Sequence, residues 1–176
     1  MKMEETMDKI CIILKDGRKI NLELYHDVAP KTVENFLKLV DANFFEGTCF
    51  HRVIKDFMIQ TGGYFIKDGM LSEKADVESI VGEFAENGFE NNLSHQLGVI
   101  SMARTNDPNS ASSQFFICSA DASFLDGKYA AFGKTIDEES NKVVLDISCV
   151  QTGALNYMFR DFPYEPIEIE KIVRIK

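Results

Sequence analysis

The residue types that most often carry enzyme chemistry do not form a nucleophilic or metal-binding pattern in this chain. Cys11, Cys49, Cys118 and Cys149 are widely spaced, and the three histidines do not complete a zinc-ligand spacing with them. No Gly-x-Ser-x-Gly elbow and no Walker-type phosphate loop occurs, and the carboxylates are scattered as on a solvated surface. We therefore expect four reduced, mostly buried thiols, no metal and no other cofactor.

Aromatic, apolar and amide side chains gather instead in three short runs. The first is Phe50-His51-Arg52-Val53-Ile54, followed closely by Phe57-Met58-Ile59-Gln60-Thr61-Gly62-Gly63. The second is Ser113-Gln114-Phe115-Phe116-Ile117. The third is Phe124-Leu125-Asp126-Gly127-Lys128-Tyr129-Ala130-Ala131-Phe132-Gly133. Taken singly, such apolar residues are more typical of a buried core than of a site, so only the combination of the runs carries information about function.

Two segments around these runs have helical patterns. Pro30 suits the first position of a helix, and an apolar stripe at helical spacing follows it, which predicts a helix from 30 to about 42. Val143, Val144 and Ile147 predict a second helix over 138–147.

The other apolar runs are short enough to be strands. Residues 10–14 and 19–24 flank Asp16-Gly17, a pair suited to a tight turn, and predict an antiparallel hairpin. A charged segment over 68–82 is typical of a loop. Further strands are expected over 50–60, 98–102, 114–118 and 167–175. The pattern predicts an all-β protein, either a sandwich or a closed barrel, and periodicity does not distinguish the two.

Length and charge restrict the organisation and the partners of the chain. Its 176 residues suit one domain, 1–176, in which residues 1–8 have the composition of a flexible N-terminal extension. A net charge of −9 argues against nucleic-acid binding. The absence of a polybasic run and of an apolar stretch of about 18 residues argues against a membrane. No signal-peptide pattern is visible, so the expected compartment is the cytoplasm.

In combination and in this order, the three runs resemble the cyclophilin family of peptidyl-prolyl cis–trans isomerases, from Cys11 to Gly133 and more loosely to the C-terminus. The resemblance implies a closed eight-stranded antiparallel β-barrel capped by two α-helices. It implies an enzyme that catalyses rotation about X–Pro bonds in peptides and folding proteins, without a covalent intermediate or a cofactor. Proline-containing peptides and unfolded protein chains would be its partners.

The resemblance also assigns roles to individual residues. Arg52 is the implied catalytic residue, because its guanidinium can donate hydrogen bonds to the prolyl carbonyl oxygen and to the amide nitrogen at the same time. His51 is read as structural support, since isomerisation moves no proton. The implied substrate-binding residues are Phe57, Met58, Gln60, Ala103, Arg104, Gln114, Phe116, Phe124, Leu125 and Tyr129.

Several positions depart from the family pattern. Phe124 stands where many members carry Trp, and Tyr129 where many carry His, and both changes indicate the bacterial-type branch. Without the indole N–H, we expect only weak binding of the cyclic peptide cyclosporin. Arg104 replaces what is usually Asn, and either favours acidic peptides or competes for the partners of Arg52. Segment 69–82 is longer than in compact members, and it either extends the substrate surface or is a tolerated insertion. Segment 152–164 has no clear counterpart in the family.

Two other functions remain open from the sequence. The chain could be a proline-peptide binding module or chaperone in which catalysis is incidental, although such a binder would not need Arg52. A barrel that binds a small apolar ligand has no motif in its favour.

Overall fold

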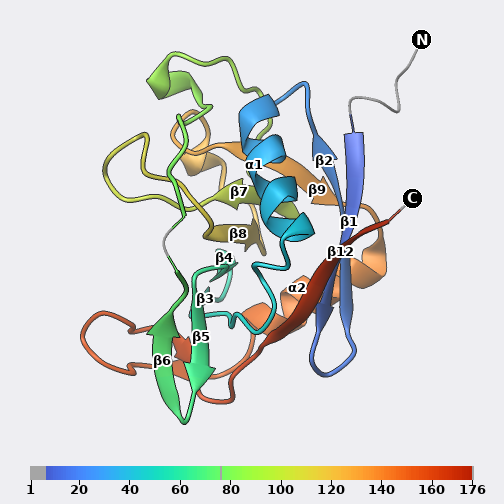
Figure 1. Ribbon diagram of the computed structural model, residues 1–176. Coiled ribbons are helices and arrows are strands. Elements are labelled where there is room, and N and C mark those ends of the chain that lie inside the picture. The colour runs from blue at the N-terminus through green and yellow to red at the C-terminus, as the bar shows by residue number, and fades with distance from the viewer. Residues whose placement is uncertain (1–6, 76, 176) are drawn as a thin grey trace.

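A strongly curled eight-stranded antiparallel sheet is the main sheet of the protein in the computed structural model, which describes residues 7–75 and 77–175 (Figure 1). The sheet order is β12-β1-β2-β9-β7-β8-β4-β3. Its strands are β1 (Met7–Leu14), β2 (Lys19–Tyr25), β3 (Arg52–Ile54), β4 (Met58–Thr61), β7 (Val99–Met102), β8 (Phe115–Cys118), β9 (Ala131–Thr135) and β12 (Ile169–Ile175).

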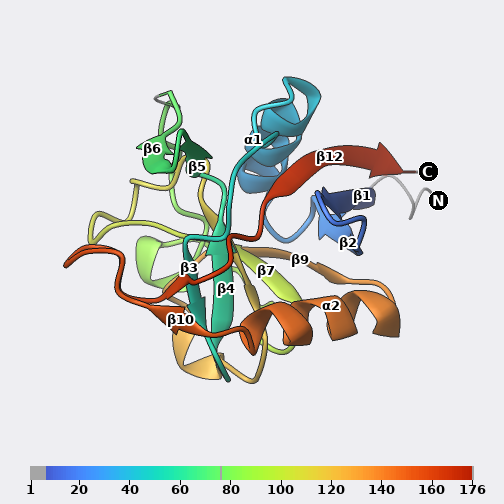
Figure 2. The same ribbon diagram turned by 90° about the horizontal axis from the view of Figure 1, so that it is seen from below.

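Two α-helices and several small elements complete the described part of the chain. The helices α1 (Pro30–Asp41) and α2 (Glu138–Ser148) lie on opposite sides of the sheet (Figure 2). Two short ladders lie beside the main sheet, and 3-10 turns occur at Ala85–Asn87 and Ser123–Leu125. The ladders are β5 (Tyr64–Lys67) with β6 (Met70–Glu73), and β10 (Thr152–Gly153) with β11 (Phe162–Pro163). None of the described helices is long and apolar enough to cross a membrane.

The sheet is an open, curled half-barrel, so the prediction of a closed barrel is wrong. The edge strands β3 and β12 form no ladder with each other in the described residues. Three backbone hydrogen bonds join residues 47–50 to residues 167–169 instead, and we call this junction the seam. Closure fails because β3 has only three residues and the outward N–H of Val53 already donates to the carbonyl of Asp161, at 2.9 Å.

The predicted helices are confirmed, and their caps explain where they begin. Pro30 occupies the first turn of α1, and the apolar stripe at Val33, Phe36, Leu37 and Val40 is buried. The Phe36 ring packs 5.1–5.3 Å from three other phenylalanine rings of the core. The side chain of Asp137 accepts a hydrogen bond from the Ser140 N–H and so caps α2, which ends one residue later than predicted.

The strand predictions are mostly confirmed, with corrections at segments 50–60 and 68–82 and at the N-terminus. The β1–β2 hairpin turns through Gly17, whose φ of 96° suits glycine. Segment 50–60 is a hairpin of β3 and β4 rather than one strand. Segment 68–82 contains β6, because its turn at Gly69 returns the chain along β5. Of the predicted flexible extension 1–8, residues 1–6 lie outside the described residues, and Met7 and Asp8 already pair with β2.

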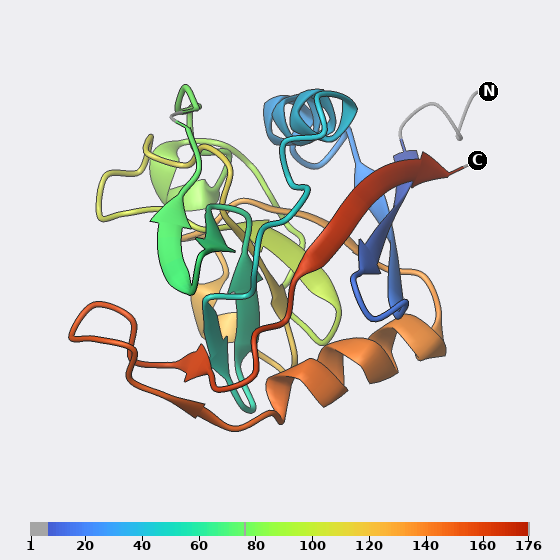
Figure 3. The same ribbon diagram turned by 60° about the horizontal axis from the view of Figure 1, so that its bottom comes forward.

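Segment 152–164 forms an arm beside the sheet. Its two ends pair as β10 and β11, and the loop between them extends away from the body of the protein (Figure 3). The loop exposes large apolar side chains, Leu155, Tyr157 and Met158. Because β11 and Asp161 lie against β3, the arm covers the edge of the strand that carries Arg52.

Candidate active site

A cavity of about 150 Å³ collects nine of the eleven predicted site residues. We call it the central cavity. Its lining residues are Arg52, Phe57, Met58, Gln60, Ala103, Arg104, Phe116, Leu125 and Tyr129. The two remaining residues, Gln114 and Phe124, lie next to it and contact members of the lining.

Strand register brings the key side chains of this cavity together. Arg52 on β3 pairs with Gln60 on β4, and Gln60 pairs in turn with Phe116 on β8. Directly opposite residues of antiparallel strands point to the same face of the sheet. An arginine, an amide and an aromatic ring therefore form one row across three strands.

Amide side chains hold the guanidinium of Arg52 at the cavity mouth. Arg52 Nη1 donates to Gln60 Oε1 at 3.4 Å, and Gln60 Nε2 donates to Gln114 Oε1 at 3.0 Å. Gly63 makes room for this chain, since a Cβ there would lie 2.7 Å from Cγ of Gln114. No ion pair with a carboxylate involves Arg52 anywhere in residues 7–75 and 77–175. Its charge is thus available to a ligand in the cavity.

The apolar walls of the central cavity come from the strands and from the 3-10 turn at 123–125. Met58, Phe116 and Leu125 are buried, and Tyr129 meets Phe116 edge to face with ring centroids 5.9 Å apart. Phe124 is 66% exposed and packs against Phe57 with ring centroids 5.5 Å apart. Phe124 therefore forms the outer edge of the site rather than its wall.

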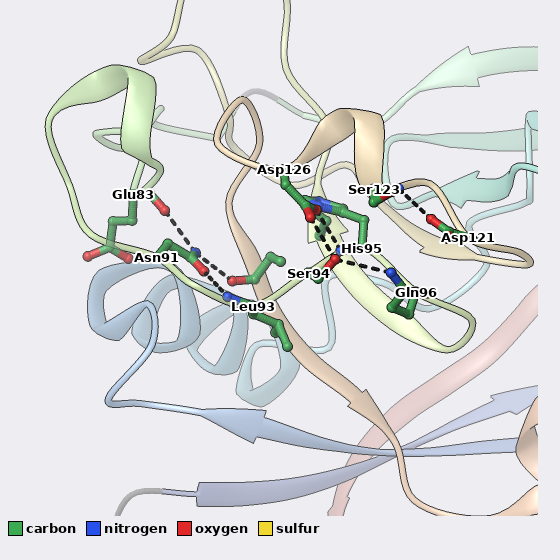
Figure 4. A network of polar contacts seen from close by, with 11 residues as sticks. Glu83, Asn91, Leu93, Ser94, His95, Gln96, Asp121, Ser123 and Asp126 are labelled. Carbon is green, nitrogen blue, oxygen red and sulfur yellow. Dashed lines mark hydrogen bonds and ion pairs between the residues drawn. The ribbon is translucent and has the colours of Figure 1, made fainter.

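His95 and Asp126 belong to a polar network that adjoins these walls. Figure 4 shows the part of the network around these two residues. His95 is fully buried and stacks against the Phe116 ring at 6.0 Å, with Nδ1 2.8 Å from Asp126 Oδ1 and Nε2 2.9 Å from Ser101 Oγ. Burial lowers the pKa of His95, against the opposing effect of the Asp126 hydrogen bond. The neutral ring donates to Asp126 and accepts from Ser101. No sequence pattern pointed to this network, because its members are not adjacent along the chain and form no motif.

Ser101, His95 and Asp126 are the residue types of a catalytic Ser-His-Asp triad, but the serine is not accessible to a substrate. Ser101 is fully buried, so no substrate carbonyl can reach its hydroxyl. Asp126 directly follows Leu125, and His95 lies against Phe116. The arrangement therefore fixes two walls of the central cavity rather than performing covalent chemistry.

His51 is also a structural group by its surroundings. Burial lowers the pKa of His51 to about 4, and the nearby charge of Arg52 acts in the same direction. Its ring packs 4.7 Å from Tyr64 and 6.1 Å from Phe159. At neutral pH the ring is uncharged, which suits support of the neighbouring Arg52 better than proton transfer.

Two further cavities share lining residues with the central one, and Gln114 lines both of them. The first, of about 270 Å³, shares Gln60, Ala103 and Arg104 with it, and we call it the rim cavity. The other, of about 350 Å³, shares Arg52, and we call it the arm cavity because residues of the arm, 158–161, line it. Glu73 of the 69–82 segment lines the rim cavity. Both of the unusual segments therefore reach the site, which their composition did not reveal.

The side chains that could ligate a metal or react as nucleophiles lie apart from one another. No group of three or more His, Cys, Asp or Glu side chains in the described part of the chain is placed to hold a metal ion. The four cysteines are free, and Cys149 is exposed while the other three are buried. Burial raises the pKa of Cys49 and of Cys118 to about 12, which keeps both as unreactive thiols.

Comparisons with known proteins agree with the geometry. The family model described as cyclophilin type peptidyl-prolyl cis-trans isomerase/CLD matches residues 10–174. A peptidyl-prolyl cis-trans isomerase of Acinetobacter baylyi is 43% identical over 155 residues, covering 85% of this chain and 77% of that protein. Peptidyl-prolyl cis-trans isomerase B of Escherichia coli is 39% identical over 161 residues, covering 87% of this chain and 92% of that protein.

Solved structures show the same similarity. A cyclophilin type isomerase of Cryptosporidium parvum, crystallised in the presence of the dipeptide Ala-Pro, matches with a TM-score of 0.74 and 28% identity. The match covers 96% of this chain and 99% of that one.

Proposed function

This chain belongs to the family of cyclophilin-type peptidyl-prolyl cis–trans isomerases, and on that premise we propose that Arg52 is its catalytic residue. The reaction is rotation about the X–Pro peptide bond. The observation that supports the role of Arg52 is its position. Its guanidinium has no carboxylate partner among the described residues, and it lies beside Gln60 in a cavity of about 150 Å³, most of whose lining residues are apolar.

The reaction needs stabilisation of a twisted amide rather than bond cleavage. Partial double-bond character gives the amide a rotation barrier of about 18–20 kcal/mol. Uncatalysed X–Pro exchange takes tens to hundreds of seconds. A turnover of about 10 per second would be about two to four decades faster, which corresponds to about 3–5 kcal/mol. In the twisted state the nitrogen regains its lone pair, so a donor aimed at it stabilises that state over both planar isomers.

Arg52 supplies such a donor in our proposal. One N–H holds the prolyl carbonyl while another approaches the nitrogen, and each charge-assisted hydrogen bond contributes about 1.5–3 kcal/mol. Together with desolvation of the amide, one or two of these bonds account for the acceleration. Gln60 and Gln114 orient the guanidinium and bind substrate backbone.

The proline ring is proposed to lie against Phe57, Met58, Phe116 and Leu125. Burial of a side chain of this size contributes about 1.5–3 kcal/mol, so the affinity for short peptides should be weak. Ala103, Arg104 and Tyr129 complete the rim, and Phe124 contacts residues beyond the proline. Weak binding suits an enzyme that acts on many X–Pro bonds.

The proposed substrates are proline-containing peptides and unfolded protein chains. The related Cryptosporidium structure was determined with Ala-Pro present, which supports a proline dipeptide as the minimal ligand. The four free thiols suit action in the cytoplasm, where thiols stay reduced.

Exchange measurements on a short Ala-Pro peptide test the proposal. With Arg52→Ala, we expect kcat/KM to fall by two or more decades while peptide binding persists. If wild type and Arg52→Ala exchange the peptide equally fast, Arg52 is not the catalyst. If wild type binds the peptide without accelerating exchange, the binding-module alternative replaces the enzyme.

A further inference from the structure

The side chain of Arg104 is fixed at the boundary between the central cavity and the rim cavity. Its Nε and Nη2 donate to the carbonyl of Lys128, at 3.1 and 2.5 Å, and its Nη1 donates to the carbonyl of Thr105 at 2.9 Å. The guanidinium also lies over two rings, 4.8 Å from the centroid of Phe84 and 4.6 Å from that of Tyr129. These contacts hold it away from Gln60, the partner of Arg52.

This position decides between the two roles that the sequence left open. Arg104 does not compete for Gln60, because its bonded N–H groups serve main-chain carbonyls. No carboxylate forms an ion pair with Arg104 in the described part of the chain, so a ligand carboxylate would have no competitor in a salt bridge there. The described lining of the central cavity therefore holds two guanidinium groups and no carboxylate, in a protein of net charge −9.

The two neighbouring cavities give the substrate a direction. Arg52 lines both the central cavity and the arm cavity, and in the proposed mechanism it holds the prolyl carbonyl, which leads to the C-terminal part of a substrate. The rim cavity does not include Arg52 and shares Arg104 with the central cavity, so in that mechanism the residues before the proline run over Arg104 toward the rim cavity.

We propose that Arg104 is a specificity-determining residue that makes this isomerase prefer substrates with a carboxylate side chain one or two residues before the proline. The inference rests on the proposed function, because it places the proline in the central cavity. A carboxylate in this place meets a pre-positioned guanidinium whose bonds to two carbonyls and two rings limit the side-chain entropy lost on binding.

Glu73 is the charge that opposes this preference. It lines the rim cavity from β6, but it is exposed to solvent, whereas Arg104 is half-buried and lines both cavities. Solvent screens an exposed charge more strongly than a half-buried one. The preference for an anion should therefore prevail in wild type and increase in Glu73→Gln.

Matched acetylated peptides with Glu, Gln or Lys at either position before the proline test the proposal by NMR exchange. In wild type at low salt, we expect kcat/KM for a Glu peptide to exceed that for its Gln partner by about three- to tenfold at one position at least, with the Lys peptide lowest. Arg104→Met keeps an apolar stem on the two rings and should reduce the ratio to about one. Arg104→Lys should restore part of it.

The ratio separates specificity from a general loss of activity, because damage to the cavity would affect the Glu and Gln peptides alike. Lys171→Met, an equal charge change at an exposed position on β12, should leave the ratio unchanged. Equal rates for Glu and Gln peptides in wild type, a preference for Lys, or a ratio that persists in Arg104→Met would overturn the inference while leaving the isomerase function intact. Failure of wild type on every peptide would instead remove the proposed function.

Discussion

Nη1 of Arg52 and Oε1 of Gln60 lie 3.4 Å apart across the β3–β4 ladder, where the two residues are register partners. The contact is long for a hydrogen bond, so it guides the guanidinium without holding it tightly. In the proposed mechanism, the guanidinium therefore keeps some freedom to follow the amide as it rotates.

Gln60→Ala should lower kcat/KM about tenfold, mainly through kcat, because the guanidinium loses its guide but keeps its charge. Exchange kinetics on an Ala-Pro peptide would measure this effect, with Lys134→Ala, an exposed change on β9, as the control. An unchanged kcat would show that Gln60 does not orient Arg52.

Stability should fall between pH 7 and pH 5 because of His51. Its folded pKa of about 4 lies below the ordinary value of 6.5, so the unfolded chain binds a proton in this window that the folded protein does not. The free energy of unfolding should decrease by about 2 kcal/mol from this group alone. Urea titrations at the two pH values measure it.

The matched variant for this pH effect is His51→Gln, which should flatten most of the slope. His95 contributes in the same direction, since its pKa is also lowered. Carboxyl groups with a lowered pKa, such as those of Asp126 and Asp137, act at more acidic pH. A wild-type curve that is flat between pH 7 and pH 5 would contradict the prediction.

Ser101→Ala should cost about 1–3 kcal/mol of stability, because it leaves Nε2 of the buried His95 without its partner. The double variant with His95→Phe should cost less than the two single changes added together, since it removes both ends of the bond. Additive losses in urea titrations would show that the two side chains are not coupled.

Phe124→Trp should tighten inhibition by cyclosporin about tenfold, because the indole adds one N–H donor at the exposed outer edge of the site. Inhibition titrations of peptide exchange measure the change. Tight inhibition of wild type would show that the missing donor is unimportant.

Local sequence patterns predicted the parts of the fold that depend on residues close together in the chain. The buried stripe of α1 and the Gly17 turn follow from side-chain spacing and backbone freedom, and both were predicted within a residue or two. The closed barrel was implied by the family resemblance and not by any local pattern. Whether β3 pairs with β12 depends on Asp161, which occupies the outer edge of β3 from over a hundred residues away.

For the site as well, the sequence predicted some residues and missed those that only tertiary packing brings together. The three runs predicted most of the residues that meet at the central cavity, and nine of the eleven predicted residues line it. The supporting residues were not predictable, because His95, Ser101 and Asp126 are common residue types that are not adjacent in the sequence and meet only in the folded chain. Glu73 and the arm likewise reach the site through tertiary packing.

The seam has a consequence for how the molecule opens. Only three backbone hydrogen bonds join residues 47–50 to 167–169, while full ladders join β4, β8 and β7. Local unfolding begins where the fewest bonds must break. Amide protons at Gly47 and Phe50 should therefore exchange with deuterium well before those of β8, because residues 47–50 can separate from 167–169 while the ladders of β4, β8 and β7 stay folded.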